Sequence, residues 1–75
     1  MTYLVSNTKD IAGNTYYLGS IYSYCPSTVK ETTMDKIRER IESGSFKAFR
    51  SLGAAQNFKA DELARAKYDG CDWAQ

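Results

Sequence analysis

The sequence predicts one small α+β domain over residues 1–75, in which an N-terminal antiparallel β-hairpin packs against two or three C-terminal helices. Two observations lead to this fold class. Aromatic and β-branched residues dominate the first 24 residues, whereas charged residues with helical spacing follow residue 29. The chain of 75 residues is 43% hydrophobic and 25% charged, as expected for a folded domain near the lower size limit for an independent core.

The hairpin is predicted from two β-prone segments, residues 2–6 and 14–24, with a third short strand as an alternative. Residues 14–24 hold four of the six tyrosines, and no charged residue occurs from Ile11 to Val29. Turn residues bound this second strand, at Gly13 before it and at Pro26 after it. Both of its faces are partly apolar, so either it is covered on both sides or one tyrosine-rich face is left for a partner.

Up to three helical segments are predicted in the second half of the chain. They are residues 29–43, residues 45–53 and residues 58–69, while residues 54–57 either extend the second helix or form a turn. The expected N-caps are Ser27 or Thr28, Ser45 and Asn57, and the expected stops are Gly44 and Gly70. The expected core consists of Leu4, Leu18, Ile21, Tyr22, Met34, Ile37, Ile41, Phe46, Phe49, Leu52 and Leu63.

The composition excludes several classes of catalytic and metal site. The chain has no histidine, so histidine-based nucleophilic catalysis and imidazole-ligated zinc are excluded, and two cysteines are too few for a Cys₄ site. No glycine opens a phosphate-binding motif. We therefore expect a protein that is not an enzyme, with no catalytic residue, no metal and no cofactor. Cys25 and Cys71 are expected to be free thiols, with a disulfide between them as the alternative.

The N-terminus lacks the basic start and long apolar run of a secretory signal, and no later segment is long and apolar enough to span a membrane. The expected location is the cytoplasm, without a membrane partner.

The run from Tyr17 to Tyr24, followed by Pro26 and the predicted helix from Val29, resembles the first strand and helix of nucleoside 2-deoxyribosyltransferase-like proteins. Those proteins often open with the run Tyr-Leu-Ala-Ser-Pro-Tyr-Ser-His. The main departures from that run are at Ile21 and Tyr24, where it has Pro and His. The resemblance implies a parallel sheet and a nucleophilic carboxylate later in the chain, and we carry neither over to this chain.

The leading functional hypothesis is a protein-binding module, because tyrosine and tryptophan are the residues that anchor protein interfaces. The predicted anchors are Tyr16, Tyr17, Tyr22, Tyr24 and Trp73, and the predicted charged rim is Asp35, Lys36, Glu39 and Arg40. Short chains of this kind are common among phage and mobile-element proteins, including anti-CRISPR inhibitors. By that analogy the partner is a host protein complex in the host cytoplasm, inhibited by steric occlusion.

Two alternatives remain open. A small nucleic-acid-binding domain would use Lys47, Arg50, Lys59 and Arg65 on phosphates, although 10 basic residues against 9 acidic ones provide no strong overall field. A self-associating subunit would pair the free edge of the hairpin with a second copy.

Overall fold

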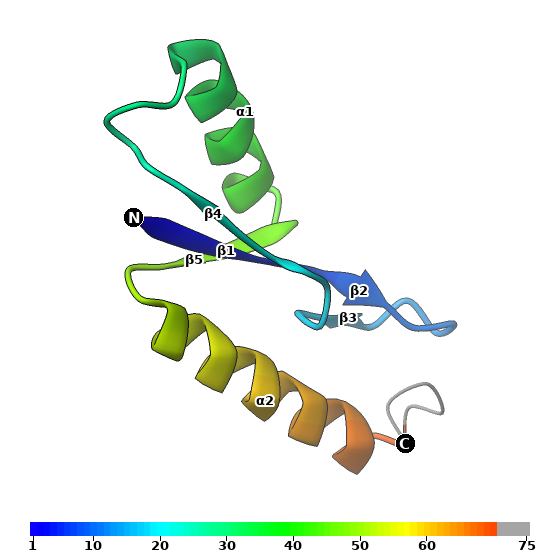
Figure 1. Ribbon diagram of the computed structural model, residues 1–75. Helices are drawn as coiled ribbons and strands as arrows, with labels where there is room; N and C mark the ends of the chain where they lie inside the picture. Colours follow the sequence, from blue (N-terminus) through cyan, green and yellow to red (C-terminus); the bar gives the residue numbers. More distant parts are fainter. Residues whose placement is uncertain (71–75) are drawn as a thin grey trace.

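The N-terminal strand β1 (Thr2–Ser6) forms the centre of a three-stranded antiparallel sheet in the computed structural model, which describes residues 1–70. Its neighbours are β4 (Ile21–Tyr24) on one side and β5 (Phe46–Phe49) on the other. Helices α1 (Glu31–Glu42) and α2 (Leu52–Tyr68) lie on opposite faces of this sheet (Figure 1). The predicted α+β class is confirmed, with two helices.

The N-terminal hairpin is present but is divided into two ladders. β1 pairs with β4, and the short strands β2 (Thr8–Lys9) and β3 (Thr15–Tyr16) form a separate two-stranded extension. Between the ladders, the N–H of Gly19 donates to the carbonyl O of Ser6 at 3.0 Å, and the N–H of Ser6 donates to the carbonyl O of Ser20 at 3.2 Å. Two residues therefore oppose one, which is a β-bulge. A Cβ on Gly19 would collide with the Ser6 side chain.

Helix α1 forms where a helix was predicted, but it is shorter than residues 29–43 and its predicted cap is wrong. Lys30 occupies the N-cap position and makes no side-chain capping bond. The hydroxyl of Thr28 instead donates to the carbonyl O of Cys25 at 3.3 Å, inside the turn that precedes the helix. The predicted stop is confirmed, since Gly44 adopts φ +84°.

The predicted helix over residues 45–53 is wrong, because residues 46–49 form β5 against the second edge of β1. The spacing of Phe46 and Phe49 suits one side of a helix, yet in the strand they point to opposite faces. Phe46 contacts Tyr22 with ring centroids 6.0 Å apart, and Phe49 contacts Phe58 at 5.0 Å. A phenylalanine on each face of the sheet accounts for the preference for strand.

The last predicted helix also begins elsewhere. α2 starts at Leu52, where the Ser51 hydroxyl accepts a hydrogen bond from the N–H of Ala54 at 3.1 Å, so Asn57 lies inside the helix and is not its cap. Residues 54–57 thus belong to the helix. The predicted stop at Gly70 is confirmed by φ +81°.

The fully buried hydrophobic residues form a smaller core than the sequence predicts. They are Leu4, Val5, Tyr16, Ala55 and Ala66. α2 approaches the sheet through its alanines, which allow close contact, and its leucines Leu52 and Leu63 are exposed. α1 contributes no fully buried side chain. Tyr22, which was also expected in the core, is exposed. The other expected core residues are half-buried, and they are Leu18, Ile21, Met34, Ile37, Ile41, Phe46 and Phe49.

Candidate functional site

An open groove lies on the sheet face that carries α1. Its volume is about 530 Å³. One wall is α1 and the other is β4, while β1, β5 and their connections form the floor. The groove is lined by Leu4, Ser6, Asn7, Tyr22, Ser23, Tyr24, Ile37, Arg40, Ser45 and Phe46.

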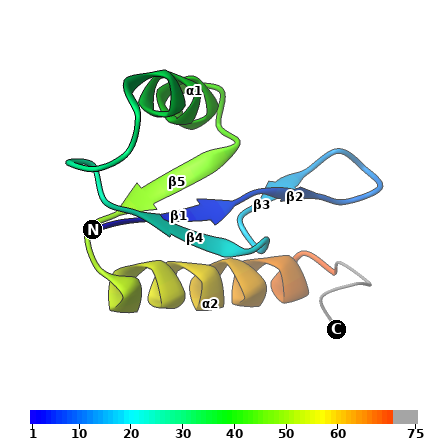
Figure 2. The same ribbon diagram turned by 45° about the horizontal axis from the view of Figure 1, so that its top comes forward.

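The groove exists because the two helices cover the sheet unevenly. α2 packs against β1 and β5, whereas α1 packs mainly against β5. In Figure 2, α1 lies above the sheet and α2 runs along its opposite face. The α1 side of β4 is therefore left open, which explains why Tyr22, on the strand, is 53% exposed.

Alternation along the strands determines which side chains face the groove. The pairs Leu4 with Tyr22 and Thr2 with Tyr24 are opposite each other in the ladder, so these side chains share one face. From α1, the guanidinium of Arg40 lies 5.8 Å from the ring centroid of Phe46, within the range of a cation–π contact. The groove thus combines aromatic rings with one cationic group.

The structure brings together three of the nine predicted partner-binding residues, Tyr22, Tyr24 and Arg40, in this groove. Three others, Asp35, Lys36 and Glu39, are exposed on α1 but are not among the groove-lining residues. Asp35 accepts a hydrogen bond from Arg38 at 3.2 Å in an exposed ion pair.

Two predicted tyrosine anchors are committed to packing. Tyr16 is 1% exposed, and its hydroxyl donates to Asp69 Oδ2 at 2.8 Å. Tyr17 is half-buried, its ring packs on Phe58 at 5.6 Å, and its hydroxyl donates to the carbonyl O of Gly44 at 2.8 Å. Tyr16 is therefore inaccessible to a partner. Trp73, the remaining predicted anchor, lies outside the described residues.

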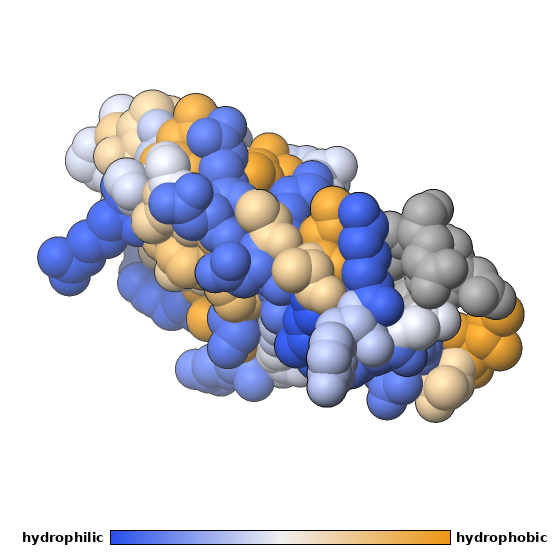
Figure 3. All heavy atoms as spheres, turned by 90° about the horizontal axis from the view of Figure 1, so that it is seen from below, coloured by the Kyte–Doolittle hydropathy of each residue, from blue (hydrophilic) through white to orange (hydrophobic). Residues whose placement is uncertain are grey.

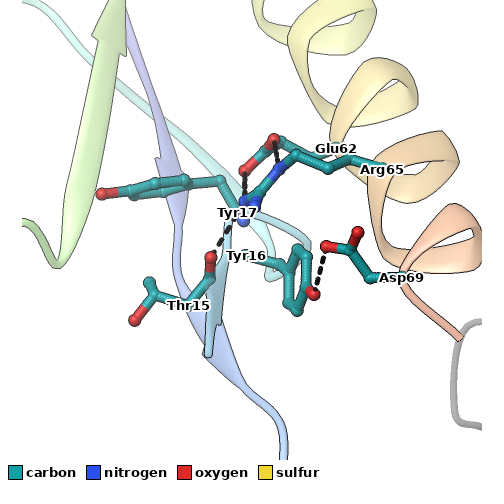
Figure 4. Close-up of polar contacts among 6 residues, drawn as sticks. All are labelled: Thr15, Tyr16, Tyr17, Glu62, Arg65 and Asp69. Atoms are coloured by element: carbon teal, nitrogen blue, oxygen red, sulfur yellow. Dashed lines mark hydrogen bonds and ion pairs between the residues drawn. The ribbon is translucent and has the colours of Figure 1, made fainter. Parts of the chain in front are cut away.

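A buried carboxylate, Glu62, connects α2 to the hairpin (Figure 4). Glu62 accepts two hydrogen bonds from the guanidinium of Arg65, at 2.8 and 2.9 Å, and one from the backbone N–H of Tyr17 at 3.2 Å. These bonds, with Arg65 the largest cause, lower the pKa of Glu62 from its ordinary value, although burial acts in the opposite direction.

Arg65 is equally committed to this cluster, which we name the Glu62 cluster: Thr15, Tyr16, Tyr17, Glu62, Arg65 and Asp69. Its guanidinium donates to the carbonyl O of Thr15 at 2.9 Å and lies 4.4 Å from the ring centroid of Tyr16. Arg65 was predicted to contact phosphate, and no role was predicted for Glu62. The i,i+3 spacing of Glu62 and Arg65 was the sequence signal for an ion pair between them, but the same spacing is common on exposed helices.

The other residues of the predicted basic patch are arranged differently. Lys47 places its Nζ 5.5 Å from the ring centroid of Tyr17, Lys59 is half-buried on α2, and Arg50 is exposed after β5. With Arg65 held in its own cluster, two of the four predicted phosphate contacts already have partners in the fold. Viewed from the α2 side, the surface is mostly hydrophilic with small apolar patches (Figure 3).

Cys25 carries a free thiol in the turn before α1. Its Sγ lies 3.1 Å from Ser27 Oγ, and this hydrogen bond, followed by one with Thr28, lowers the pKa of Cys25 to about 7. Backbone hydrogen bonds from Ser27 and Thr28 in the same turn lower this pKa further. Cys71 lies outside the described residues.

Within residues 1–70, no group of three or more His, Cys, Asp or Glu side chains is placed to hold a metal ion. None of the helices in that part of the chain is long and apolar enough to cross a membrane. No protein-family model, curated protein or solved structure matches the chain.

Proposed function

We propose that the protein is a non-enzymatic protein-binding module whose binding surface is the groove beside α1. The observation that carries the proposal is a tyrosine, Tyr22, that is 53% exposed on a sheet face that α1 leaves partly open. Tyrosine and arginine dominate binding hot spots, and Tyr24 and Arg40 line the same groove. Among residues 1–70, Arg40 is the one charged residue in the lining, and the other polar groups there are hydroxyls and the Asn7 amide.

Within this proposal, the module is a phage or mobile-element inhibitor, comparable to anti-CRISPR proteins, and occludes a host protein complex. The support for this part is the analogy of a short chain rich in tyrosine. The support for protein over nucleic acid is that Arg65 and Lys47 are engaged with Glu62 and Tyr17.

The proposal is tested by capturing partners from a lysate of the natural host on the tagged protein. Washes at high salt and with nuclease remove complexes that depend on nucleic acid. The matched pair of variants is Tyr22→Ser in the groove and Tyr68→Ser on α2, where Tyr68 is 92% exposed. We expect Tyr22→Ser to weaken capture about 30-fold, the loss of a hot-spot contact of about 2 kcal/mol, and Tyr68→Ser to leave it unchanged.

Capture of the same protein by wild type and Tyr22→Ser would contradict the groove as the binding surface. Partners that disappear on nuclease treatment would favour the nucleic-acid alternative, with Arg50 and Lys59 as the next residues to change. Circular dichroism of both variants controls for the fold.

A further inference from the structure

We infer that the partner binds as an added β-strand along the free edge of β4, and that it carries an acidic residue opposite Arg40. This inference rests on the proposed function and specifies the chemistry of the partner. It concerns an extended peptide segment of another protein, recognised by backbone hydrogen bonds, aromatic contacts and one ion pair.

The free edge of β4 follows from the order of the sheet, because within residues 1–70 β4 is paired with β1 alone. The N–H of Ser6 donates to the carbonyl O of Ser20, so the backbone groups of Ser20 point toward β1. Because these groups alternate along an antiparallel strand, those of Tyr22 and Tyr24 also point toward β1, and those of Ile21 and Ser23 point away from it. Two N–H and two C=O groups are therefore available to an incoming strand.

The edge of β4 is short and is flanked by a bulge, but Ile21–Tyr24 carries no charged side chain and no proline. Exposed edges are commonly protected by charged side chains, proline or a covering helix. β4 has the sequence Ile-Tyr-Ser-Tyr, and no charged residue occurs from Ile11 to Val29. The bulge at Gly19 and the turn containing Pro26 limit the edge to a short segment without blocking it.

The opposite edge of the sheet, on β5, is a poorer site. Both helices pack against β5, and Lys47 lies within the strand. Residues added beside β4, by contrast, would place alternate side chains next to Tyr22 and Tyr24 on the groove face.

Charge complementarity indicates the partner's acidic residue. The ion pairs among residues 1–70 join Arg38 to Asp35 and Arg65 to Glu62, which leaves Arg40 with its contact to the Phe46 ring and no carboxylate partner. Arg40 lines the same groove as both tyrosines of β4. A carboxylate at this position would form a charge-assisted pair with the guanidinium.

The inference is tested with a displayed library of random short peptides, selected against wild type, Arg40→Glu and Lys36→Glu. Lys36 is on α1 but does not line the groove, so its variant is the matched control for charge. We expect wild type and Lys36→Glu to enrich acidic peptides with alternating β-branched residues, and Arg40→Glu to enrich basic ones. An acidic peptide from the wild-type selection should bind Arg40→Glu at least about ten-fold more weakly.

The same peptide is then used to measure amide hydrogen exchange. The amides of Ile21 and Ser23 should exchange rapidly in the free protein, because they point away from β1, and strand addition should protect them. Ser23→Pro should weaken peptide binding at least about ten-fold. It should leave the pairing of β4 with β1 intact, because the N–H of Ser23 points away from β1. The wild-type exchange data decide the question if this variant does not fold.

Several outcomes would overturn the inference. One is the enrichment of peptides with helical apolar spacing whose binding does not slow exchange of the Ile21 and Ser23 amides. Another is the enrichment of the same peptides whether residue 40 is Arg or Glu. A third is failure to enrich any peptide. A fourth is protection of these amides without peptide as protein concentration rises, which would identify a second copy as the occupant. Failure of the proposed function differs from all of these, because Tyr22→Ser would then leave host-protein capture unchanged.

Discussion

At the scale of single residues, Glu62 links helix α2 to the N-terminal hairpin. Its carboxylate accepts hydrogen bonds from Arg65 on α2 and from the backbone N–H of Tyr17, and it is 8% exposed. Removing one member of such a buried group leaves the others without partners, and this cost exceeds the net value of the bonds themselves. The Glu62 cluster should therefore influence stability more than any exposed ion pair.

We predict that Glu62→Gln lowers the free energy of unfolding by about 2 kcal/mol at neutral pH, because the charge-assisted bonds to Arg65 are lost. The lowered pKa of Glu62 means that its contribution is present above the ordinary value of 4.5 and is lost as pH falls through the folded-state pKa. The difference between wild type and variant should thus narrow on acidification. Urea unfolding across this range measures it, with the exposed Glu42→Gln as control. A difference independent of pH would contradict the assignment.

A second prediction concerns Cys25, whose pKa is lowered to about 7 by hydrogen bonds led by that with Ser27. The thiolate is the reactive form, so alkylation by iodoacetamide should inflect near pH 7. Ser27→Ala should move the inflection toward the ordinary value of 9.0, and Thr28→Val should move it less. Both are measured in a Cys71→Ser background. An unchanged inflection in Ser27→Ala would exclude the hydroxyl as the main cause.

At the scale of elements, the two helices differ in how they are held. α2 buries Ala55, Glu62 and Ala66 and has a side-chain cap at Ser51, whereas α1 buries no side chain fully and has Lys30 at its N-cap. Local stability follows the extent of tertiary contact, so amides of α1 should exchange faster than those of α2. The helix that forms one wall of the groove is therefore the less tightly packed of the two.

The caps provide a matched pair of substitutions. Ser51→Ala should destabilise the protein by about 1 kcal/mol, because the N–H of Ala54 loses its acceptor. Lys30→Ser should stabilise α1 by up to about 1 kcal/mol. Lys30 already has the extended backbone of an N-cap residue and lacks only an acceptor side chain. Amide exchange in α1 and urea unfolding measure the two effects. A change in stability of the same sign and size in both helices would show that the two N-caps contribute equally.

β5 shows how packing overrides a local pattern. The spacing of Phe46 and Phe49 predicts a helix as readily as a strand, because an i,i+3 pair shares a helical face and also spans both faces of a sheet. The choice depends on β1, which has a second edge for β5 to pair with and buries Leu4 and Val5 between the helices. No property of residues 45–53 alone contains that information.

At the scale of the whole molecule, the extents of 40 × 24 × 14 Å describe a flat domain in which a thin sheet separates two helices. The two helices, of 12 and 17 residues, do not cover both faces of this sheet completely. α2 covers its face closely through alanines, and α1 covers the other only in part. The groove is the part of the sheet face that remains uncovered.

Local sequence properties were enough to predict the α+β class, the N-terminal hairpin in outline, a helix at the position of α1 and the glycine stops at Gly44 and Gly70, because strand propensity, helical periodicity and left-handed turns depend on nearby residues. Nine residues were predicted to form one binding surface, and three of them, Tyr22, Tyr24 and Arg40, line the groove. Three outcomes required the folded structure: residues 46–49 form a strand, Tyr16 is buried while Tyr22 is exposed, and Arg65 pairs with Glu62. These outcomes depend on contacts between residues far apart in the chain, and alternation along a strand does not show which face a helix will cover.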